Sequence, residues 1–445
     1  MDNMLFSKQD LKKLIVPLIF EQLLVIMVGM ADTMMVSSVG EAAVSGVSLV
    51  DMLNNLVISV LAALATGGAV VTSHFIGANK KEEACRSAKQ LVYTAGLITI
   101  GISILILLFR KPLLQLFFGQ IDADVMECAL IYLVISTYSF PFLAVYNACG
   151  ALFRSMGNSQ ITLKVSVLMN VINIVGNAIC VFGLKMGVAG VAVPSLVSRA
   201  VAAFVLYALL KDPSNMVHFL KEPFHFEWDV IRKILYIGIP SGIENGIFQL
   251  GRVIVVSIIA GFGTVQIAAN GVANSLDSCG CIIGQGMSLA MITVIGRCVG
   301  AKDEKQIRYY TKKLMIFTYA STAVCNTILL LSLRWILGFY GLSAETTQLS
   351  WILVMIHNGM AIFLWPASFV FPNMLRACND VRFPMACSIF SMFVFRIGFS
   401  YIFGVNMGMG AIGVWIAMVL DWIFRVICFV CRYLSGAWKK KCALG

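Results

Sequence analysis

Charged residues are scarce in this chain of 445 residues. Only 12% of the residues are charged and 59% are hydrophobic, against about 25% and about 45–50% in soluble domains. The apolar residues fall into runs of about 20, the length that an α-helix needs to cross about 30 Å of hydrocarbon. We therefore predict an all-α polytopic membrane protein. Its twelve expected transmembrane helices lie at residues 14–36, 47–74, 89–109, 128–151, 161–183, 187–210, 234–259, 268–296, 311–333, 348–374, 384–405 and 411–433.

The sequence also lacks the motifs of ATP-driven pumps and of hydrolytic enzymes. It contains no GxxxxGK[ST] phosphate-binding loop and no GxSxG nucleophile motif. The four histidines are scattered, and the CxxC pair Cys428 and Cys431 lies on an apolar segment with no His nearby. A membrane-embedded enzyme or scaffold, the rival class, would need a reactive His or Cys partnership. We expect no enzyme activity and no cofactor, so any pumping must draw on an ion gradient.

The chain is a tandem repeat. Five residues of the first half recur 223 positions later: Pro17, Glu21, Gly40, Gly77 and Ala78 match Pro240, Glu244, Gly263, Gly300 and Ala301. Such doubling in a membrane protein is typical of transporters, with the substrate path between the halves. We predict two pseudo-symmetric six-helix bundles, at residues 1–210 and 234–445, the second with a short basic tail. Residues 211–233, with mixed charges and two prolines, form the expected cytoplasmic linker.

Basic residues predict the orientation. With both termini and every second loop inside, 25 of the 33 Lys and Arg residues face the cytoplasm, and only Arg110, Lys111, Lys185 and Arg334 face out. We expect a multi-pass protein of the plasma membrane with both termini cytoplasmic. The net charge of +11 then anchors loops on anionic lipid and indicates no nucleic-acid partner. We expect the chain to act as a monomer in the bilayer.

Ionisable residues inside the spans carry the chemistry, because a charge at the bilayer centre costs about 2.5–3.5 kcal/mol on insertion scales. Asp421 and Arg425 are four residues apart and are expected to form a structural ion pair. Asp51 and Asp277 are expected near helix ends, and Arg199 and Arg396 have no assigned role. The other candidates are Glu21, Asp32, Glu244 and Arg252.

Asp32 stands in an Ala-Asp-Thr segment, fifteen residues after Pro17. Three further segments are informative. Phe-Ile-Gly-Ala-Asn-Lys ends span two, the similar Cys-Val-Gly-Ala-Lys-Asp follows span eight, and Leu-Phe-Arg-Ser-Met-Gly-Asn follows span four. With these motifs in this order, the whole chain resembles the multidrug and toxic compound extrusion (MATE) family of cation-coupled exporters.

The resemblance implies a cation site in the first half. Asp32 would hold the coupling ion with polar residues of spans five and six, which map by spacing to Asn173, Asn177 and Ser195. Some relatives have Asp where this chain has Asn177, so the choice between Na⁺ and H⁺ stays open. The alternative is that Asn170, Asn173 and Asn177 only form hydrogen bonds between helices, worth about 0.6 kcal/mol each.

The second half has no copy of Asp32, since Val255 takes its place, and Trp365 stands where some relatives have an acidic residue. Glu21 and Glu244 lie at matching depths, so we expect them to bind a cationic substrate. The alternative is that each satisfies backbone groups freed by the preceding proline. The other expected substrate-binding residues are Gln22, Asn245, Gln249 and Arg252.

These expectations give a function. An antiporter would export amphipathic organic cations by alternating access, driven by Na⁺ or H⁺ bound at Asp32. The chain has 23 Met and 29 Phe, whose side chains can adapt to varied ligands. The alternative is a flippase or an exporter of a lipid-linked or polar metabolite. An arginine-rich cleft would favour that cargo, and in the sequence only Arg252 and Arg199 suggest one.

Overall fold

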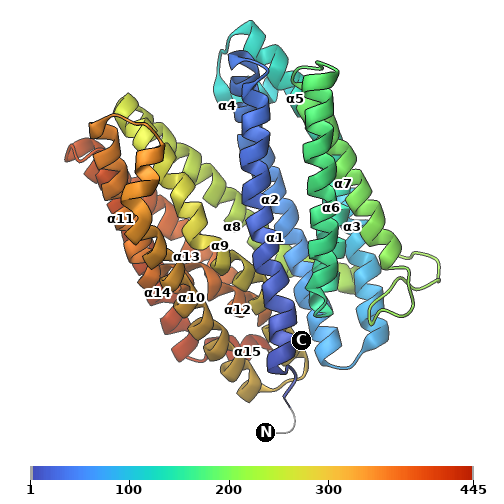
Figure 1. Cartoon of the computed structure of the whole chain (residues 1–445). Helices are drawn as coiled ribbons and strands as arrows, with labels where there is room; N and C mark the ends of the chain where they lie inside the picture. The colour runs from blue at the N-terminus through green and yellow to red at the C-terminus, as the bar shows by residue number, and fades with distance from the viewer. Residues whose placement is uncertain (1–3, 443–445) are drawn as a thin grey trace. The chain divides into compact units, whose positions relative to one another are not determined.

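The computed structural model describes residues 4–442, which form helices and no strand (Figure 1). Twelve helical segments are long and apolar enough to cross a membrane. Each overlaps one of the twelve predicted runs, so the predicted fold class is confirmed. The spans are Lys8–Ser37, Glu41–Gly77, Lys81–Leu108, Ala123–Ser155, Ser159–Gly183, Ala189–Leu209, Trp228–Ala260, Thr264–Gly300, Glu304–Phe339, Ala344–Ala377, Arg382–Asn406 and Ala411–Leu434.

One compact unit comprises Phe6–Gly242. In it α2 (Glu41–Gly77) packs along α5 (Ala123–Ser155), which also contacts α3 (Lys81–Leu108) and α7 (Ala189–Leu209). The blue α1 (Lys8–Ser37) lies beside the green α6 (Ser159–Ala178) (Figure 1). These contacts bring α1, α6 and α7 together, the three helices on which the predicted cation ligands lie. The remaining elements are the short α4 (Arg110–Phe118), the π-helical η1 (Ile179–Gly183) and the first part of α8 (Trp228–Ala260).

The other compact unit comprises Ile243–Gly445 with the N-terminal end of the chain. Its central helix α9 (Thr264–Gly300) packs against α10 (Glu304–Phe339) and α11 (Ala344–Trp365). The backbone N–H of Leu5 donates to Oε1 of Gln306, 2.9 Å away, and Lys439 lies 2.7 Å from Glu304. The remaining elements are η2 (Pro366–Val370), α12 (Pro372–Ala377), α13 (Arg382–Ser391), η3 (Met392–Gly398), η4 (Tyr401–Asn406), α14 (Ala411–Leu434) and α15 (Ala437–Cys442).

The repeat is visible in the backbone. Residues with a positive φ recur 223 positions apart, in the pairs Gly40 and Gly263, Asn79 and Lys302, Lys185 and Gly408, and Gly187 and Gly410. In the first pair each glycine precedes the helix at its N-cap, with φ of 138° and 105°. These angles lie where residues with a Cβ are strained. The turns of the two halves are therefore built alike.

The offset between the halves is one residue shorter in the middle of each half. Gly157 and Asn379, both with positive φ, are 222 apart, and the offset returns to 223 at Lys185 and Gly408. One extra residue thus lies in span eleven, which contains the π-helical η3 and η4. A π-helical turn accommodates such an insertion, and π-helical turns are frequent at functional sites.

The loop at residues 211–227 forms no helix and packs on α3. Lys89 Nζ donates to the backbone oxygen of Leu220 at 3.1 Å, and the ring of Tyr93 stacks on Phe224 with centroids 4.6 Å apart. The loop is thus held against the bundle that precedes it.

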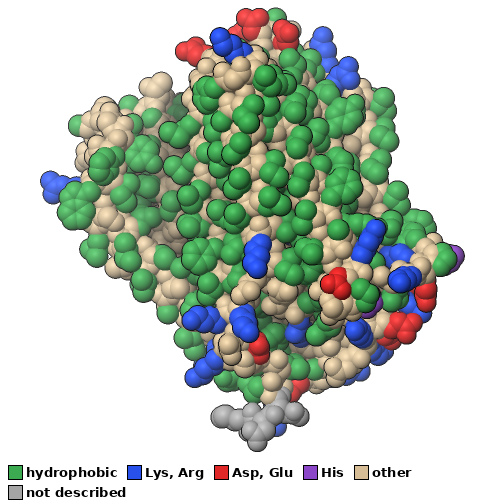
Figure 2. Space-filling model, turned by 45° about the vertical axis from the view of Figure 1, so that its right-hand side comes forward, with side chains coloured by type: hydrophobic (Ala, Val, Ile, Leu, Met, Phe, Trp, Pro, Cys, Tyr) green, Lys and Arg blue, Asp and Glu red, His purple; other side chains and the backbone are tan. Residues whose placement is uncertain are grey.

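Large hydrophobic side chains are exposed along the spans, among them Phe204, Leu331 and Trp335. On the face drawn in Figure 2, hydrophobic side chains form a broad belt, and most charged side chains lie above or below it. Exposure of this extent on a soluble monomer would drive association. In a bilayer, acyl chains cover it.

Candidate functional site

Four side chains that the sequence assigns to a cation site form one hydrogen-bonded chain. Asn177 Nδ2 donates to Asp32 Oδ1 at 2.7 Å and lies 3.3 Å from Asn173 Oδ1, and Asn173 Nδ2 donates to Ser195 Oγ at 2.8 Å. The two asparagines lie one turn apart on α6, so they face the same point. Both are buried, with exposed fractions of 5% and 0%. The chain of bonds links α1, α6 and α7.

The structure adds two charged residues, Asp51 and Arg199, that sequence reasoning left without a role in this site. Asp51 lies well inside α2, so its expected place near a helix end is wrong, and it accepts a hydrogen bond from Tyr132 Oη at 3.1 Å. Arg199 donates to Ser139 Oγ at 2.7 Å. Asp32, Asp51 and Arg199 are near enough to interact electrostatically. The sequence shows Asp51 and Arg199 as charges within spans, but it does not show that they lie near Asp32, because the three residues are far apart in the sequence.

The charges of this N-terminal cluster do not balance. Two carboxylates, Asp32 and Asp51, interact electrostatically with the single guanidinium of Arg199. In addition, the buried Asn177 Oδ1 accepts no hydrogen bond from any residue between 4 and 442. A buried oxygen without a partner is uncommon in folded proteins. The cluster therefore has an oxygen acceptor and one negative charge to offer a single cation.

In the other unit, Glu244 lies in a buried ion pair. Its Oε2 is 2.6 Å from Arg376 Nη2, and its Oε1 accepts a hydrogen bond from Ser388 Oγ at 2.6 Å. The repeat-related Glu21 accepts from Thr162 Oγ1 at 3.2 Å. Both glutamates are buried. These partners are side chains rather than the backbone groups freed by the preceding proline, and each glutamate is engaged within its own bundle.

A second buried network continues from Ser388. Arg425 Nη1 donates to Ser388 Oγ at 3.1 Å, and Arg425 Nε lies 3.0 Å from Asp421 Oδ1, which confirms the expected ion pair. Arg396 Nη1 reaches Asp421 from another helix at 3.5 Å. One carboxylate thus serves two guanidinium groups. Arg396 has a definite place in the protein interior that sequence reasoning did not assign.

The other predicted substrate-binding residues are spread over two helices. Gln22, Asn245 and Gln249 are half-buried, on α1 and α8. Arg252 lines a small cavity of the C-terminal unit together with Arg396, whereas Glu244 is not among the residues lining that cavity. Arg252 and Glu244 therefore do not line this cavity together.

The buried His357 and the partly buried Asp277 form a pair that joins α9 and α11. The imidazole also packs edge to face against Trp422 and Trp415, with centroids 4.8 and 5.7 Å apart. Asp277 lies inside α9 (Thr264–Gly300), so its expected place near a helix end is wrong. Sequence reasoning missed the pair because its two members lie on different helices.

Between residues 4 and 442, the structure contains no cluster of three or more His, Cys, Asp or Glu side chains that could hold a metal ion. The N-terminal cluster is instead built from two carboxylates with amide and hydroxyl oxygens. Such hard oxygen ligands suit a hard cation.

The model of the MatE family matches residues 17–179 and 240–402. The two matched stretches begin 223 residues apart and together cover most of the chain. The chain belongs to the MatE family. It is thus a membrane transporter built from two copies of one MatE unit.

Relatives of this MatE protein include the "uncharacterized transporter YisQ" of Bacillus subtilis. It is 27% identical over 432 residues, which is 96% of this chain and 94% of that protein. The "probable multidrug resistance protein NorM" of Thermotoga maritima is 26% identical over 446 residues, covering 98% and 94%.

Solved structures share the fold. The outward-facing conformation of a multidrug resistance MATE family transporter superposes with a TM-score of 0.90 at 20% identity, over 97% of each chain. A MATE protein in the bent conformation gives 0.88 at 20% identity, over 98% of this chain and 97% of that one.

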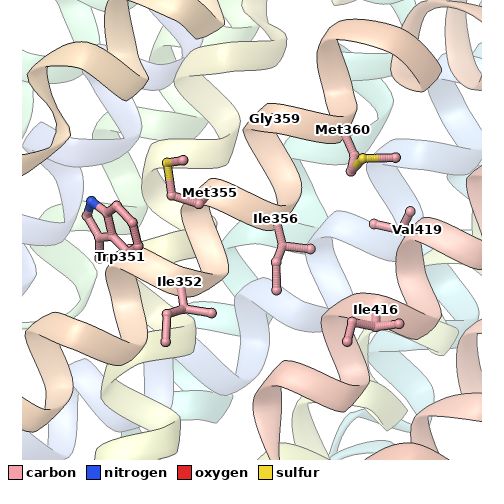
Figure 3. A pocket seen from close by; sticks show the side chains of 8 residues that line it. All are labelled: Trp351, Ile352, Met355, Ile356, Gly359, Met360, Ile416 and Val419. Carbon is pink, nitrogen blue, oxygen red and sulfur yellow. The ribbon is translucent and has the colours of Figure 1, made fainter.

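The MatE chain also has an apolar groove formed by α11 and α14. Figure 3 shows Ile356 and Met360 of α11 on the side of Ile416 and Val419 of α14, whereas Met355 lies further away beside Trp351. None of the eight lining residues is charged. The groove therefore offers nothing that would select a charged ligand, and it fits acyl chains of the bilayer.

Proposed function

We propose that this MatE protein exports small amphipathic organic compounds and that Asp32 binds the cation that drives the export. The observation that carries the proposal is the N-terminal cluster. Its two carboxylates interact electrostatically with one guanidinium, and a buried amide oxygen of Asn177 lacks a hydrogen-bond partner among the described residues. An excess negative charge and a free acceptor together suit one monovalent cation.

The cation acts on the packing of α1. Asp32 is joined to α6 through Asn177 at 2.7 Å. Na⁺ would take oxygens from Asp32, Asn177 and Ser195, which turns the amide of Asn177 and removes its N–H from Asp32. H⁺ would neutralise one carboxyl and weaken the same charge-assisted bond. Either ion therefore changes the link between α1 and α6, and alternating access couples that change to release of the cargo.

We propose two alternative classes of cargo. Organic cations are supported by the words "multidrug resistance" in the names of relatives and by the many Met and Phe residues. The two glutamates expected to hold them are buried and engaged. A polar or lipid-linked metabolite is favoured by a specific observation, since Arg396 lines the cavity that Arg252 lines.

Transport by purified protein in liposomes tests this function. Ethidium and fluorescein, a planar cation and a planar anion, are loaded in parallel, and the Na⁺ and H⁺ gradients are collapsed separately. We expect export of at least one dye to stop when one gradient is removed. Export that persists without either gradient would contradict ion coupling.

A further inference from the structure

The small cavity of the C-terminal unit is the repeat counterpart of the N-terminal cluster. At the offset of 223 residues, Asp32, Asp51 and Ser195 correspond to Val255, Asn274 and Met418. All three counterparts line the cavity. Arg396, which also lines it, stands 223 residues after Asn173, in the span where the offset changes from 222 to 223. The two sites thus occupy the same place in the two bundles.

Their chemistry is opposite. Val255 and Asn274 remove the two carboxylates, while Arg252 brings a guanidinium group to the position equivalent to Gly29. Arg396 brings a second guanidinium group from the span that corresponds to the span of Asn173. Gly29 has no side chain, so Arg252 adds a charge for which the first bundle has no counterpart. No Asp or Glu lines the cavity.

The cavity presents mainly hydrogen-bond donors. Both guanidinium groups donate only. Trp415 Nε1 donates to Asn270 Oδ1 at 2.9 Å, which leaves the amide NH₂ of Asn270 to donate to a ligand. Asn274, which also lines the cavity, has a second amide group. A ligand that satisfies this lining must accept hydrogen bonds.

The surrounding charges leave an excess of positive charge. Arg252 and Arg396 repel each other. Arg396 shares the carboxylate of Asp421 with Arg425, and Asp277 is in contact with His357. With the pair Glu244 and Arg376 included, four guanidinium groups face three carboxylates, before any charge on His357 is counted. A guanidinium without a carboxylate inside a span is expensive unless a ligand or water compensates it.

The size of the cavity limits what enters. Its volume is about 40 Å³, and one water molecule needs roughly 10–15 Å³ on this measure. A carboxylate or the oxygens of a phosphate can enter, whereas pockets for drug-sized ligands have volumes of roughly 300 Å³ or more. The rest of a larger ligand would lie outside the cavity.

We propose that Arg252 and Arg396, at the repeat position of the N-terminal cation cluster, form an anion site that binds the carboxylate or phosphate group of a small amphipathic molecule. The first bundle binds a cation and the second binds an acidic headgroup, through one duplicated site with inverted charge. The inference rests on the proposed function only in treating that molecule as cargo.

Equilibrium binding to the purified full chain in nonionic detergent tests the site. The probes are dodecanoate, dodecyl phosphate and dodecyltrimethylammonium, which share an alkyl chain and differ in headgroup. We expect at least one of the two anions to bind about tenfold or more tightly than the cation, as one charged hydrogen-bonding partner requires. The anion that binds more tightly identifies the headgroup.

Variants distinguish binding at this site from general partitioning of the alkyl probes. Arg252→Gln should weaken anion binding about tenfold, and Val255→Asp, which restores the carboxylate of the first bundle, should abolish it. Arg334→Gln removes an exposed charge of the same unit and should change nothing. Equal binding of all three probes, or full anion binding by Arg252→Gln, would overturn the proposal.

The Asp32→Asn variant distinguishes this inference from the proposed function. It should lose ion-driven transport and keep anion binding, because Asp32 lies in the other unit. Transport that depends on Asp32 without anion binding in the wild type would refute the anion site and leave ion-coupled export standing.

Discussion

Asn177 Nδ2 lies 2.7 Å from Asp32 Oδ1, and the same nitrogen lies 3.3 Å from Asn173 Oδ1. The amide nitrogen of Asn177 thus links α6 to α1 and also contacts Asn173 within α6. The amide oxygen of Asn177 has no hydrogen-bond partner among residues 4–442. The amide can rotate to present that oxygen to a cation and withdraw its N–H from Asp32. Asn177 therefore links α1 to α6 through its N–H groups and keeps its oxygen available as a cation ligand.

Replacing Asp32 with Asn should abolish ion-driven export. The amide still hydrogen-bonds with Asn177, so folding should be preserved, but it carries no negative charge for Na⁺ and takes no proton near neutral pH. The measurement is dye export from liposomes at equal protein content. Asp124→Asn, which alters an exposed carboxylate of the same unit, is the matched control. Normal export by Asp32→Asn would remove Asp32 from the coupling site.

Replacing Arg376 with Ala should destabilise the C-terminal unit. The change leaves Glu244 buried without its ion-pair partner, and breaking a buried pair costs about 3–5 kcal/mol. That corresponds to a fall of about 10 °C in the apparent melting temperature in detergent. Arg86 and Glu82 are 2.7 Å apart but largely exposed, so Arg86→Ala should melt close to the wild type. Equal effects of the two substitutions would show that burial of the Glu244 pair does not matter.

Local patterns predicted much of the fold and part of the site. The length of the apolar runs located every span, and the spacing of Asn173 and Asn177 placed both on one face of α6 because helical periodicity is local. Contacts between residues on different helices could not be predicted in this way, because they depend on tertiary packing. Arg396 could snorkel or pair, and only tertiary packing decides that it meets Asp421 and Arg252. The repeat offset identified Val255 as the residue that replaces the Asp32 carboxylate, but it could not predict that Arg396, in the π-helical η3, lines a cavity with Val255.

The first turn of α10 should depend on Asp303. Its side chain accepts from the backbone N–H of Gln306 at 3.0 Å, and this bond holds the pKa of Asp303 below its ordinary value. A lowered pKa means that the stabilisation is present above about pH 4 and is lost as the pH falls through the folded-state pKa. Asp303→Ala should therefore cost about 1 kcal/mol, unchanged between pH 6 and 8. Thermal melting at both pH values checks this.

The repeat provides the control for that substitution. Lys80 occupies the equivalent N-cap of α3 and makes no capping hydrogen bond with its side chain. Lys80→Ala should leave the melting temperature nearly unchanged. A similar loss for both variants would show that the Asp303 side chain contributes no cap.

Gly280 should tolerate no larger residue. A Cβ at this position would lie 2.4 Å from Asn326 Oδ1 and 2.5 Å from Asn358 Nδ2, two atoms that bond each other at 2.7 Å. Both asparagines are fully buried, so their side chains have no space to move into, and overpacking of this kind costs about 1–3 kcal/mol. Gly280→Ala should lower the melting temperature of the purified protein. Gly271, on the same helix, has no atom within 4 Å of the added Cβ, so Gly271→Ala should match or exceed the wild type because alanine favours the helix by about 1 kcal/mol. If Gly280→Ala were equally stable, the Asn326 and Asn358 pair would not be fixed against α9, and the close approach of α9 to α10 and α11 would need another cause.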